Sequence, residues 1–399
     1  MSNPNTILPP FPVPTDWQGV SNLYPIQTDS LWLNFCGISP VSTYAKETMA
    51  DFLDEYSKFG IFAPRYSEPK VKGYIRDYIA KILNCSPHNI GLVHNTSEGM
   101  NLYSHSIRLP EGSRILLLEN EYPSNVYPWE HWQKKGVQIE FVTLGKTPDE
   151  FFANLETAFA KGKVSLLSIS PVHWCIGMPL DMEKISSLCK KNGALLVVDG
   201  SQSVGHVHSD YKKWNVDFAV FAAWKWLLGP LGMGVIYISD DVPEGFELIF
   251  KGAGSVKNDS IYLPYREERK PPADQFEHST ANFNDWVYFL ASLRMLTDIG
   301  YPKVMDRIYE ISGKISDMLR RLGFTLDSDN FPNSKSGIIG VTGFSSKKPF
   351  VPDEIQLFLK EKKIYTAVRL GRVRIAPHIS VTERHIDVLE SALKEYLSK

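Results

Sequence analysis

The sequence has few cysteines and almost no net charge. Its 399 residues include four cysteines, and none of these forms a CxxC pair or has histidines at the spacing of a zinc site. We therefore expect reduced thiols, no bound metal and a cytoplasmic protein. The formal net charge is only -2, so the sequence has no basic excess for binding a phosphate backbone, and no nucleic acid partner is expected.

Long apolar runs are also missing. No segment approaches the roughly 20 apolar residues that span a bilayer, and residues 1–17 lack the early positive charge and apolar core of a secretion signal. We expect a soluble, unsecreted protein with no membrane partner. Hydrophobic residues (43%) and charged residues (22%) are close to globular averages. The length exceeds that of one compact core, so a large and a smaller domain are expected.

Short apolar runs alternate with longer amphipathic stretches along the first two thirds of the chain. This pattern predicts an α/β fold with a mainly parallel sheet that is covered by helices on both faces. Ligands bind such sheets at the carboxyl ends of the strands. The expected strands are 114–119, 164–169, 194–198, 218–222 and 234–238, and the expected helices are 149–160 and 182–192.

The remaining segments indicate three parts. We expect an irregular N-terminal arm over residues 1–25, a large domain over 26–285 and a small C-terminal domain over 286–399, with the N-terminal segment able to pack on the last. The periodic segment 286–299 opens a long helix into the small domain. Further expected elements are a helix at 304–322, strands at 338–343 and 373–375, and a final helix at 383–397.

Two consecutive expected strands lead into ionisable residues. Asp199 ends one strand and opens the motif DGSQSVG, and Lys225 follows the next strand within WKWLLGP. Pyridoxal 5'-phosphate (PLP) needs both groups, because a lysine holds its aldehyde as an imine and a carboxylate keeps its ring nitrogen protonated. Taken alone, Asp199 would equally serve as a helix N-cap and Lys225 as a surface lysine.

This pair of motifs resembles the class V group of the aspartate aminotransferase fold. The group includes cysteine desulfurases, selenocysteine lyases and isopenicillin N epimerase-like enzymes, and the resemblance covers residues 33–399. It implies a PLP-dependent transferase fold (fold type I), with a large, mainly parallel sheet domain and a smaller α+β domain. It also implies PLP as cofactor and a homodimer with shared active sites.

The resemblance implies further cofactor contacts. Thr96 and Ser97, in HNTSEGMN, would receive the phosphate at a helix start, where the helix dipole favours an anion; the alternative is a simple capping turn. Tyr122 would stack on the pyridine ring, unless it is a core tyrosine. Gln202 would bond the phenolic oxygen of the cofactor.

Two predicted roles depend on loops. His173, or its neighbour Trp174, would face the same phenolic oxygen in the segment SPVHWCIGMPL, and a structural histidine is the alternative. Thr280, in EHSTAN, would reach the phosphate bound to the other subunit. Otherwise Thr280 caps a loop or a helix.

The substrate is expected to meet an arginine near the end of the chain. Arg374, in AVRLGRVRIAPH, would grip the substrate carboxylate, because a guanidinium matches a carboxylate with two parallel hydrogen bonds. Arg372 shares its strand face. Asn34 is a further candidate for substrate binding, at the mouth of the site.

The sequence differs from the cysteine desulfurases in two respects. No cysteine follows Cys189, and Gly371 leads directly into Arg372, so the loop that would carry a nucleophilic thiol is missing. A persulfide mechanism is therefore not expected. Trp224 precedes the lysine where a histidine is frequent, which resembles the epimerase-like branch.

We therefore expect a PLP-dependent enzyme that acts on an amino acid, by aminotransferase or epimerase-like chemistry. In this hypothesis the freed Lys225 is the general base. The alternative reaction is cleavage of the carbon–sulfur bond of cysteine or cystine by β-elimination. The alternative from another class is a non-catalytic PLP-fold scaffold, against which the joint presence of Asp199, Gln202 and Lys225 argues.

Overall fold

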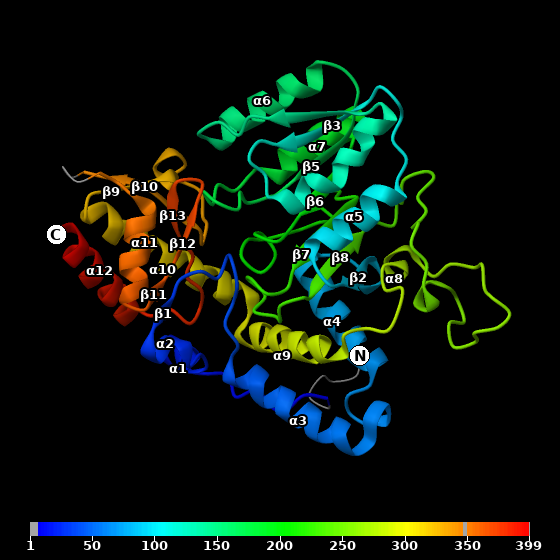
Figure 1. Cartoon of the computed structure of the whole chain (residues 1–399), viewed down its shortest axis with the longest axis horizontal. Helices are drawn as coiled ribbons and strands as arrows, with labels where there is room; N and C mark the ends of the chain where they lie inside the picture. Colours follow the sequence, from blue (N-terminus) through cyan, green and yellow to red (C-terminus); the bar gives the residue numbers. More distant parts are fainter. Residues whose placement is uncertain (1–6, 346–348, 399) are drawn as a thin grey trace.

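A seven-stranded sheet forms the centre of the computed structural model, which describes residues 7–345 and 349–398 (Figure 1). The strand order is β2-β8-β7-β6-β5-β3-β4. The strands are β2 (Ile90–Val93), β3 (Arg114–Leu118), β4 (Gln138–Val142), β5 (Val164–Ile169), β6 (Leu195–Asp199), β7 (Phe218–Ala222) and β8 (Gly234–Ile238).

Each of the five strands expected from the sequence is present, with limits within one residue of the prediction. Strands β4, β3, β5, β6 and β7 run parallel, as buried strands joined by crossovers should. Strand β8 differs from this expectation, because it is antiparallel to both β7 and β2. Residues 223–233 between β7 and β8 contain no helix, so the chain turns back beside β7 instead of crossing over the sheet.

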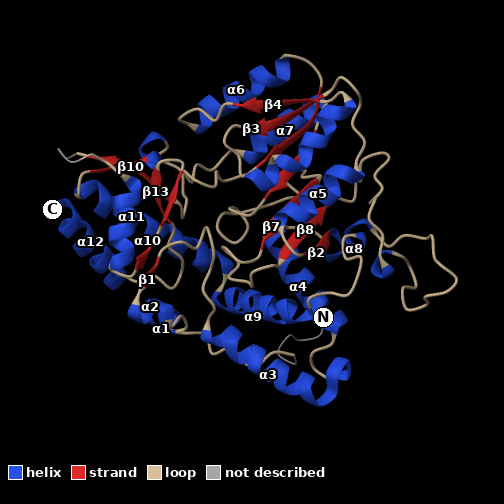
Figure 2. Cartoon of the chain, viewed as in Figure 1, coloured by secondary structure: helices blue, strands red, loops and turns tan. Residues whose placement is uncertain are grey.

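Helices cover both faces of this sheet (Figure 2). Apolar side chains of α5 and of the 3-10 turns at 127–135 pack on one face, and those of α4, α6, α7 and α9 pack on the other. The helices are α3 (Thr43–Phe59), α4 (Glu68–Leu83), α5 (Thr96–Ser106), α6 (Pro148–Ala160), α7 (Met182–Asn192), α8 (Pro272–Gln275) and α9 (Phe283–Ile299). Two buried faces explain why the strands read as continuous apolar runs.

A second, four-stranded antiparallel sheet lies in the C-terminal part, in the order β12-β13-β10-β9. The chain enters this part through α9 and α10, which Gly300 separates at φ 98°. The elements are α10 (Tyr301–Arg321), β9 (Phe324–Leu326), β10 (Ile339–Phe344), α11 (Pro352–Glu361), β11 (Ile364–Tyr365), β12 (Ala367–Arg369), β13 (Arg372–Ile375) and α12 (Glu383–Ser398). The strands and helices expected after residue 300 are thus present.

The N-terminal segment lies beside the C-terminal elements (Figure 1). It forms α1 (Trp17–Asn22), α2 (Ile26–Asp29) and β1 (Leu31–Trp32), and β1 pairs in parallel with β11. The arm is therefore not wholly irregular: the Asp16 carboxylate caps α1 by accepting from the Gly19 N–H at 2.7 Å. Residues 1–6 of the expected arm lie outside the described residues. The division into three parts stays a prediction.

Candidate active site

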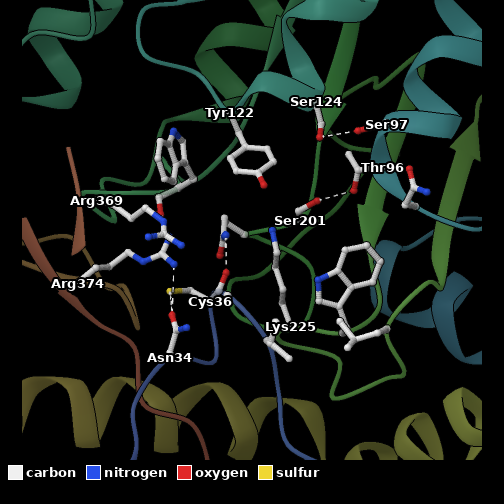
Figure 3. Close-up of a pocket in the computed structure, with 17 residues that line it drawn as sticks. Asn34, Cys36, Thr96, Ser97, Tyr122, Ser124, Ser201, Lys225, Arg369 and Arg374 are labelled. Carbon is white, nitrogen blue, oxygen red and sulfur yellow. Dashed lines mark hydrogen bonds between the residues drawn. The ribbon is translucent and has the colours of Figure 1, made fainter. Parts of the chain in front are cut away.

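A cavity of about 430 Å³ opens where the strands β3, β5, β6 and β7 end, the edge at which sheets of this type bind ligands. Its wall comes from residues 34–38, from the start of α5, and from the loops that follow β3, β5, β6 and β7. The two C-terminal strands β12 and β13 complete it. Figure 3 shows side chains from all these segments pointing into one space.

Lys225 lies half-buried in this cavity, three residues after β7. Its Nζ has no hydrogen-bond partner among the described residues, and it lies 5.4 Å from the centre of the Tyr122 ring. Burial lowers the pKa of Lys225, and the negative charge of Asp199 opposes this shift. A lysine in such surroundings is a candidate nucleophilic amine.

Asp199 is the last residue of β6 and is only 2% exposed. Its carboxylate accepts from the Ser201 N–H at 2.9 Å. Burial raises the pKa of Asp199, and the positive charge of Lys225 opposes that shift. Turns follow it instead of a helix, so the capping alternative does not apply. A buried carboxylate needs a cation nearby, and a protonated ring nitrogen would serve.

Four hydroxyl groups lie close together near the start of α5, on the side of the cavity away from Arg369 and Arg374 (Figure 3). Thr96 Oγ1 and Ser201 Oγ lie 3.0 Å apart, and Ser97 Oγ and Ser124 Oγ lie 2.8 Å apart. The positive end of the helix dipole and these donors suit a phosphate. Ser124 and Ser201 were not predicted, although each stands two residues after a predicted residue, in EYPSN and DGSQ.

Tyr122 and Gln202 also line the cavity. Tyr122 is 42% exposed and meets Trp174 edge to face at 5.4 Å, so it is not a core tyrosine. The Gln202 amide is already engaged: its Nε2 donates to the Cys36 carbonyl and its Oε1 accepts from Trp226 Nε1, both at 2.9 Å. These two bonds fix the orientation of the Gln202 side chain.

Of the two neighbours His173 and Trp174, it is Trp174 that lines the cavity. His173 is 1% exposed, and its Nδ1 accepts from the Cys175 N–H at 3.2 Å. Burial lowers the pKa of His173 to about 4. The imidazole of His173 points into its own loop, where it serves as the acceptor that the backbone N–H groups of the loop need. The wall of the cavity thus contains Trp174, the alternative that the sequence left open, and which of the two faces the cofactor stays a prediction.

Arg374 is 3% exposed and lines the cavity, as expected. Its Nη1 donates to the Trp174 carbonyl at 2.8 Å and its Nη2 to Asn34 Oδ1 at 3.3 Å. Its buried Nε has no partner among the described residues. The Nε of Arg372 instead lies 2.7 Å from the Asp327 carboxylate. Of these two arginines, Arg374 is therefore the one available to a substrate anion.

Thr280 lies apart from this cavity. It lines a separate, smaller pocket together with residues around His94 and Glu98. A contact between Thr280 and the cofactor phosphate would thus require a second copy of the chain. That role stays a prediction.

Besides Ser124 and Ser201, the sequence reasoning missed three further residues at or near the site. Cys36 and Arg369 line the cavity, and Glu121 is a buried carboxyl at the end of β3. Burial and the charge of Asp199 raise the pKa of Glu121 to about 7. Arg369 stood within the motif that was used for Arg374. Cys36 follows Asn34 by two positions, but nothing in that spacing marked it.

These residues suit PLP. The partnerless amine of Lys225 can take the aldehyde, the buried Asp199 carboxylate can face a ring nitrogen, and the hydroxyls at α5 can take the phosphate. The unpartnered Nε of Arg374 leaves a buried cation for the carboxylate of an amino acid. Of the described residues that line the cavity, none is acidic, so no carboxylate in the wall would repel these anions.

Such a site on a mainly parallel sheet places the chain among the PLP-dependent enzymes of fold type I. More narrowly, the chain belongs to the aminotransferase class-V family, whose model matches residues 69–385. The family resemblance drawn from the motifs is confirmed. None of the helices in residues 7–345 and 349–398 is long and apolar enough to cross a membrane.

Known proteins similar to this chain include desulfurases and a lyase. A probable cysteine desulfurase of Pyrococcus abyssi is 29% identical over 295 residues, which are 72% of this chain and 71% of that protein. The apo cysteine desulfurase of Thermococcus onnurineus NA1 superposes with a TM-score of 0.83 at 21% identity, over 98% and 99% of the two chains. C-DES, a cystine C-S lyase solved with glycine covalently linked to its PLP cofactor, gives 0.83 at 22% identity, over 93% and 98%.

Proposed function

We propose that Lys225 attaches PLP in this enzyme and then acts as the base at the α carbon of an amino acid substrate. The observation that carries this proposal is the Lys225 amine, which lies in the cavity without a hydrogen-bond partner among the described residues. Burial lowers its pKa, so more of the amine is unprotonated at neutral pH. Bound PLP supplies an electron sink for the charge that develops on the α carbon.

Other residues would hold the cofactor in place. Asp199 would keep the ring nitrogen protonated, because a buried carboxylate stabilises a nearby cation. The hydroxyls of Thr96 and Ser97, with those of Ser124 and Ser201, would hold the phosphate. Tyr122 would cover the ring.

The substrate would be oriented by the C-terminal side of the cavity. Arg374 would bind the α-carboxylate, and Asn34 and the Trp174 carbonyl hold its guanidinium in place. This orientation would point the α-proton to Lys225, which would remove it. Lys225 could then return a proton to the cofactor carbon, for transamination, or to the α carbon, for epimerisation. Aminotransferase and epimerase-like chemistry both use that single movable proton.

Cleavage of a carbon–sulfur bond is the second candidate. It is favoured by the similarity to a probable cysteine desulfurase and to a cystine C-S lyase. The turn between β12 and β13 consists only of Leu370 and Gly371, so no loop presents a thiol there. Cys36 is the one cysteine among the described residues that lines the cavity. It is 1% exposed, and burial raises the pKa of its thiol. Sulfur would thus be released and not stored as a persulfide.

A homodimer in the cytoplasm is part of the proposal. Large apolar side chains are exposed near residues 61–62 and 261–265, including Phe62 at 83% and Tyr265 at 89%, as expected of a surface that a partner covers. Thr280 would then complete the phosphate site of the other subunit. Mixing Lys225→Ala with Thr280→Val subunits tests this: activity from the mixture, with neither variant active alone, is the expected result.

A panel of amino acids tests the reaction class. Each is added to the purified holoenzyme while the visible absorption of the cofactor is followed, with Lys225→Ala as the control. Conversion to the pyridoxamine spectrum supports transamination, and release of pyruvate and ammonia from cysteine or cystine supports elimination. If no amino acid alters the spectrum of the wild-type holoenzyme, the proposed function is wrong.

A further inference from the structure

Three arginines share one face of the hairpin formed by β12 and β13. The strands pair with Ala367 opposite Arg374 and Arg369 opposite Arg372, and directly opposed residues of an antiparallel pair lie on the same face. The two-residue turn has φ of 47° at Leu370 and 72° at Gly371, the positive values of a tight hairpin turn. This short turn fixes Arg369 opposite Arg372 and diagonal to Arg374.

Of the three arginines, only Arg372 forms an ion pair with a carboxylate of the described residues. Arg372 pairs with Asp327, and Arg374 is placed to hold the substrate α-carboxylate. Arg369 donates only to the neighbouring Val368 carbonyl, at 2.7 Å, and no carboxylate of the described residues forms an ion pair with it. Arg369 and Arg374 thus bring two guanidinium charges to the cavity without a carboxylate of the described residues, and an anion bound there would interact with both.

Arg369 also faces the space that a substrate would occupy. It lines the same cavity as Arg374, and Figure 3 shows the two side chains together, on the side away from Thr96 and Ser97. The Cys36 thiol lies among the cations: the charges of Arg374, Lys225 and Arg369 all lower its pKa, against the larger effect of burial. An anion bound by Arg369 would therefore lie beside Arg374, where the substrate is proposed to bind. It would not be the cofactor phosphate.

We propose that Arg369 binds a second carboxylate of the substrate, so that the enzyme prefers amino acids carrying two carboxylates. This inference rests on the proposed function and names the substrate class for it. The second carboxylate has two chemical sources: an acidic side chain, as in aspartate or glutamate, or the far half of cystine. In both cases Arg374 takes the α-carboxylate and Arg369 takes the other.

Titration of the holoenzyme tests the preference. Apparent Kd values are taken from the change in cofactor absorption with L-aspartate, L-glutamate and L-cystine, and with the neutral L-alanine and L-2-aminobutyrate. Calorimetry with glutarate and butyrate, which carry no amine, measures carboxylate binding without any chemistry. We expect the wild type to bind diacids about 10- to 100-fold more tightly than neutral counterparts, the value of one charge-assisted contact.

Variants assign the preference to one side chain. Arg369→Gln should remove most of the diacid preference and leave the neutral amino acids unaffected, and Arg369→Lys should keep part of it. Arg384→Gln, which removes an exposed arginine of α12 outside the cavity, should behave as the wild type. Preference for cystine alone assigns the second carboxylate to its far half, and preference for aspartate or glutamate assigns it to the side chain.

Two results overturn the inference: equal affinity of the wild type for diacids and neutral counterparts, or an equal loss of both in Arg369→Gln. The failure of the proposed function has a different signature. In that case no amino acid changes the cofactor spectrum, or the spectrum of Lys225→Ala matches the wild type. The comparison of glutarate with butyrate would still report on Arg369.

Discussion

Arg374 donates a hydrogen bond to Asn34 at 3.3 Å, although the two residues stand 340 positions apart. The contact is possible because β1 pairs with β11 and Asn34 forms an isolated bridge with Ala376. Both ends of the chain thus build the part of the cavity wall around Arg374. Asn34 and Cys36 precede residue 69, where the match to the family model begins.

Arg374 and Arg372 should give opposite results when each is changed to glutamine. Arg374→Gln should raise the KM for the amino acid about 100-fold, because two charge-assisted hydrogen bonds are lost. Arg372→Gln should leave KM near that of the wild type but lower the free energy of unfolding by about 1–3 kcal/mol, because the largely buried Asp327 loses its partner. Steady-state kinetics and thermal unfolding separate the two effects. A large KM increase in Arg372→Gln would contradict the assignment.

Asp199→Asn should weaken PLP binding and slow turnover on the order of 100- to 1,000-fold, since the charge that holds the ring nitrogen protonated is removed. Cofactor titration and single-turnover rates measure this. Asp217→Asn is the matched control, because Asp217 is also a mostly buried carboxylate that accepts a backbone N–H, from Leu196 at 2.7 Å, but it stands directly before the start of β7, whereas Asp199 stands at the end of β6. A control that slowed turnover as strongly would show that the effect is structural.

Cys36→Ala should retain most of the activity. The thiol is buried, and burial raises its pKa, so little nucleophilic thiolate is present at neutral pH. The bond from Gln202 to residue 36 uses the backbone carbonyl and survives the change. Loss of activity in Cys36→Ala, together with a sulfur adduct on Cys36 in the mass spectrum of the wild type, would reverse this assignment.

The Glu121 carboxyl should make stability depend on pH. Its pKa rises from an ordinary value of 4.5 to about 7 in the folded chain, so the folded state binds more protons than the unfolded state between these values. The stability contribution is therefore complete below about pH 4.5 and is lost as the pH rises through 7. Relative to the wild type, cofactor-free Glu121→Gln should gain up to about 3 kcal/mol between pH 4.5 and 8 in denaturant unfolding. A pH-independent difference would contradict the shifted pKa.

The sequence predicted the parts of this molecule that depend on local patterns. Strands buried on both faces read as apolar runs, so β3, β5, β6, β7 and β8 could be found to within a residue. Lys225 and Asp199 could be placed together because the carboxyl ends of neighbouring parallel strands meet at one edge. The direction of β8 could not be read, because its apolar run is the same in either direction.

The missed residues depend on contacts between distant segments. Cys36 reaches the cavity only because the N-terminal segment pairs with β11. Arg369 lines the cavity because a two-residue turn fixes the register of β12 on β13. His173 is turned away from the cavity because the Cys175 N–H donates to its imidazole, and Trp174 lines the cavity instead. None of these contacts has a signature in the local sequence.

The central claim is that Lys225 carries the cofactor, and borohydride reduction of the holoenzyme followed by peptide mass spectrometry tests it most directly. The account predicts a pyridoxyl group on the peptide that contains Lys225, and no visible cofactor band fixed by reduction in Lys225→Ala. A pyridoxyl group on another lysine, or unchanged labelling in Lys225→Ala, would contradict it.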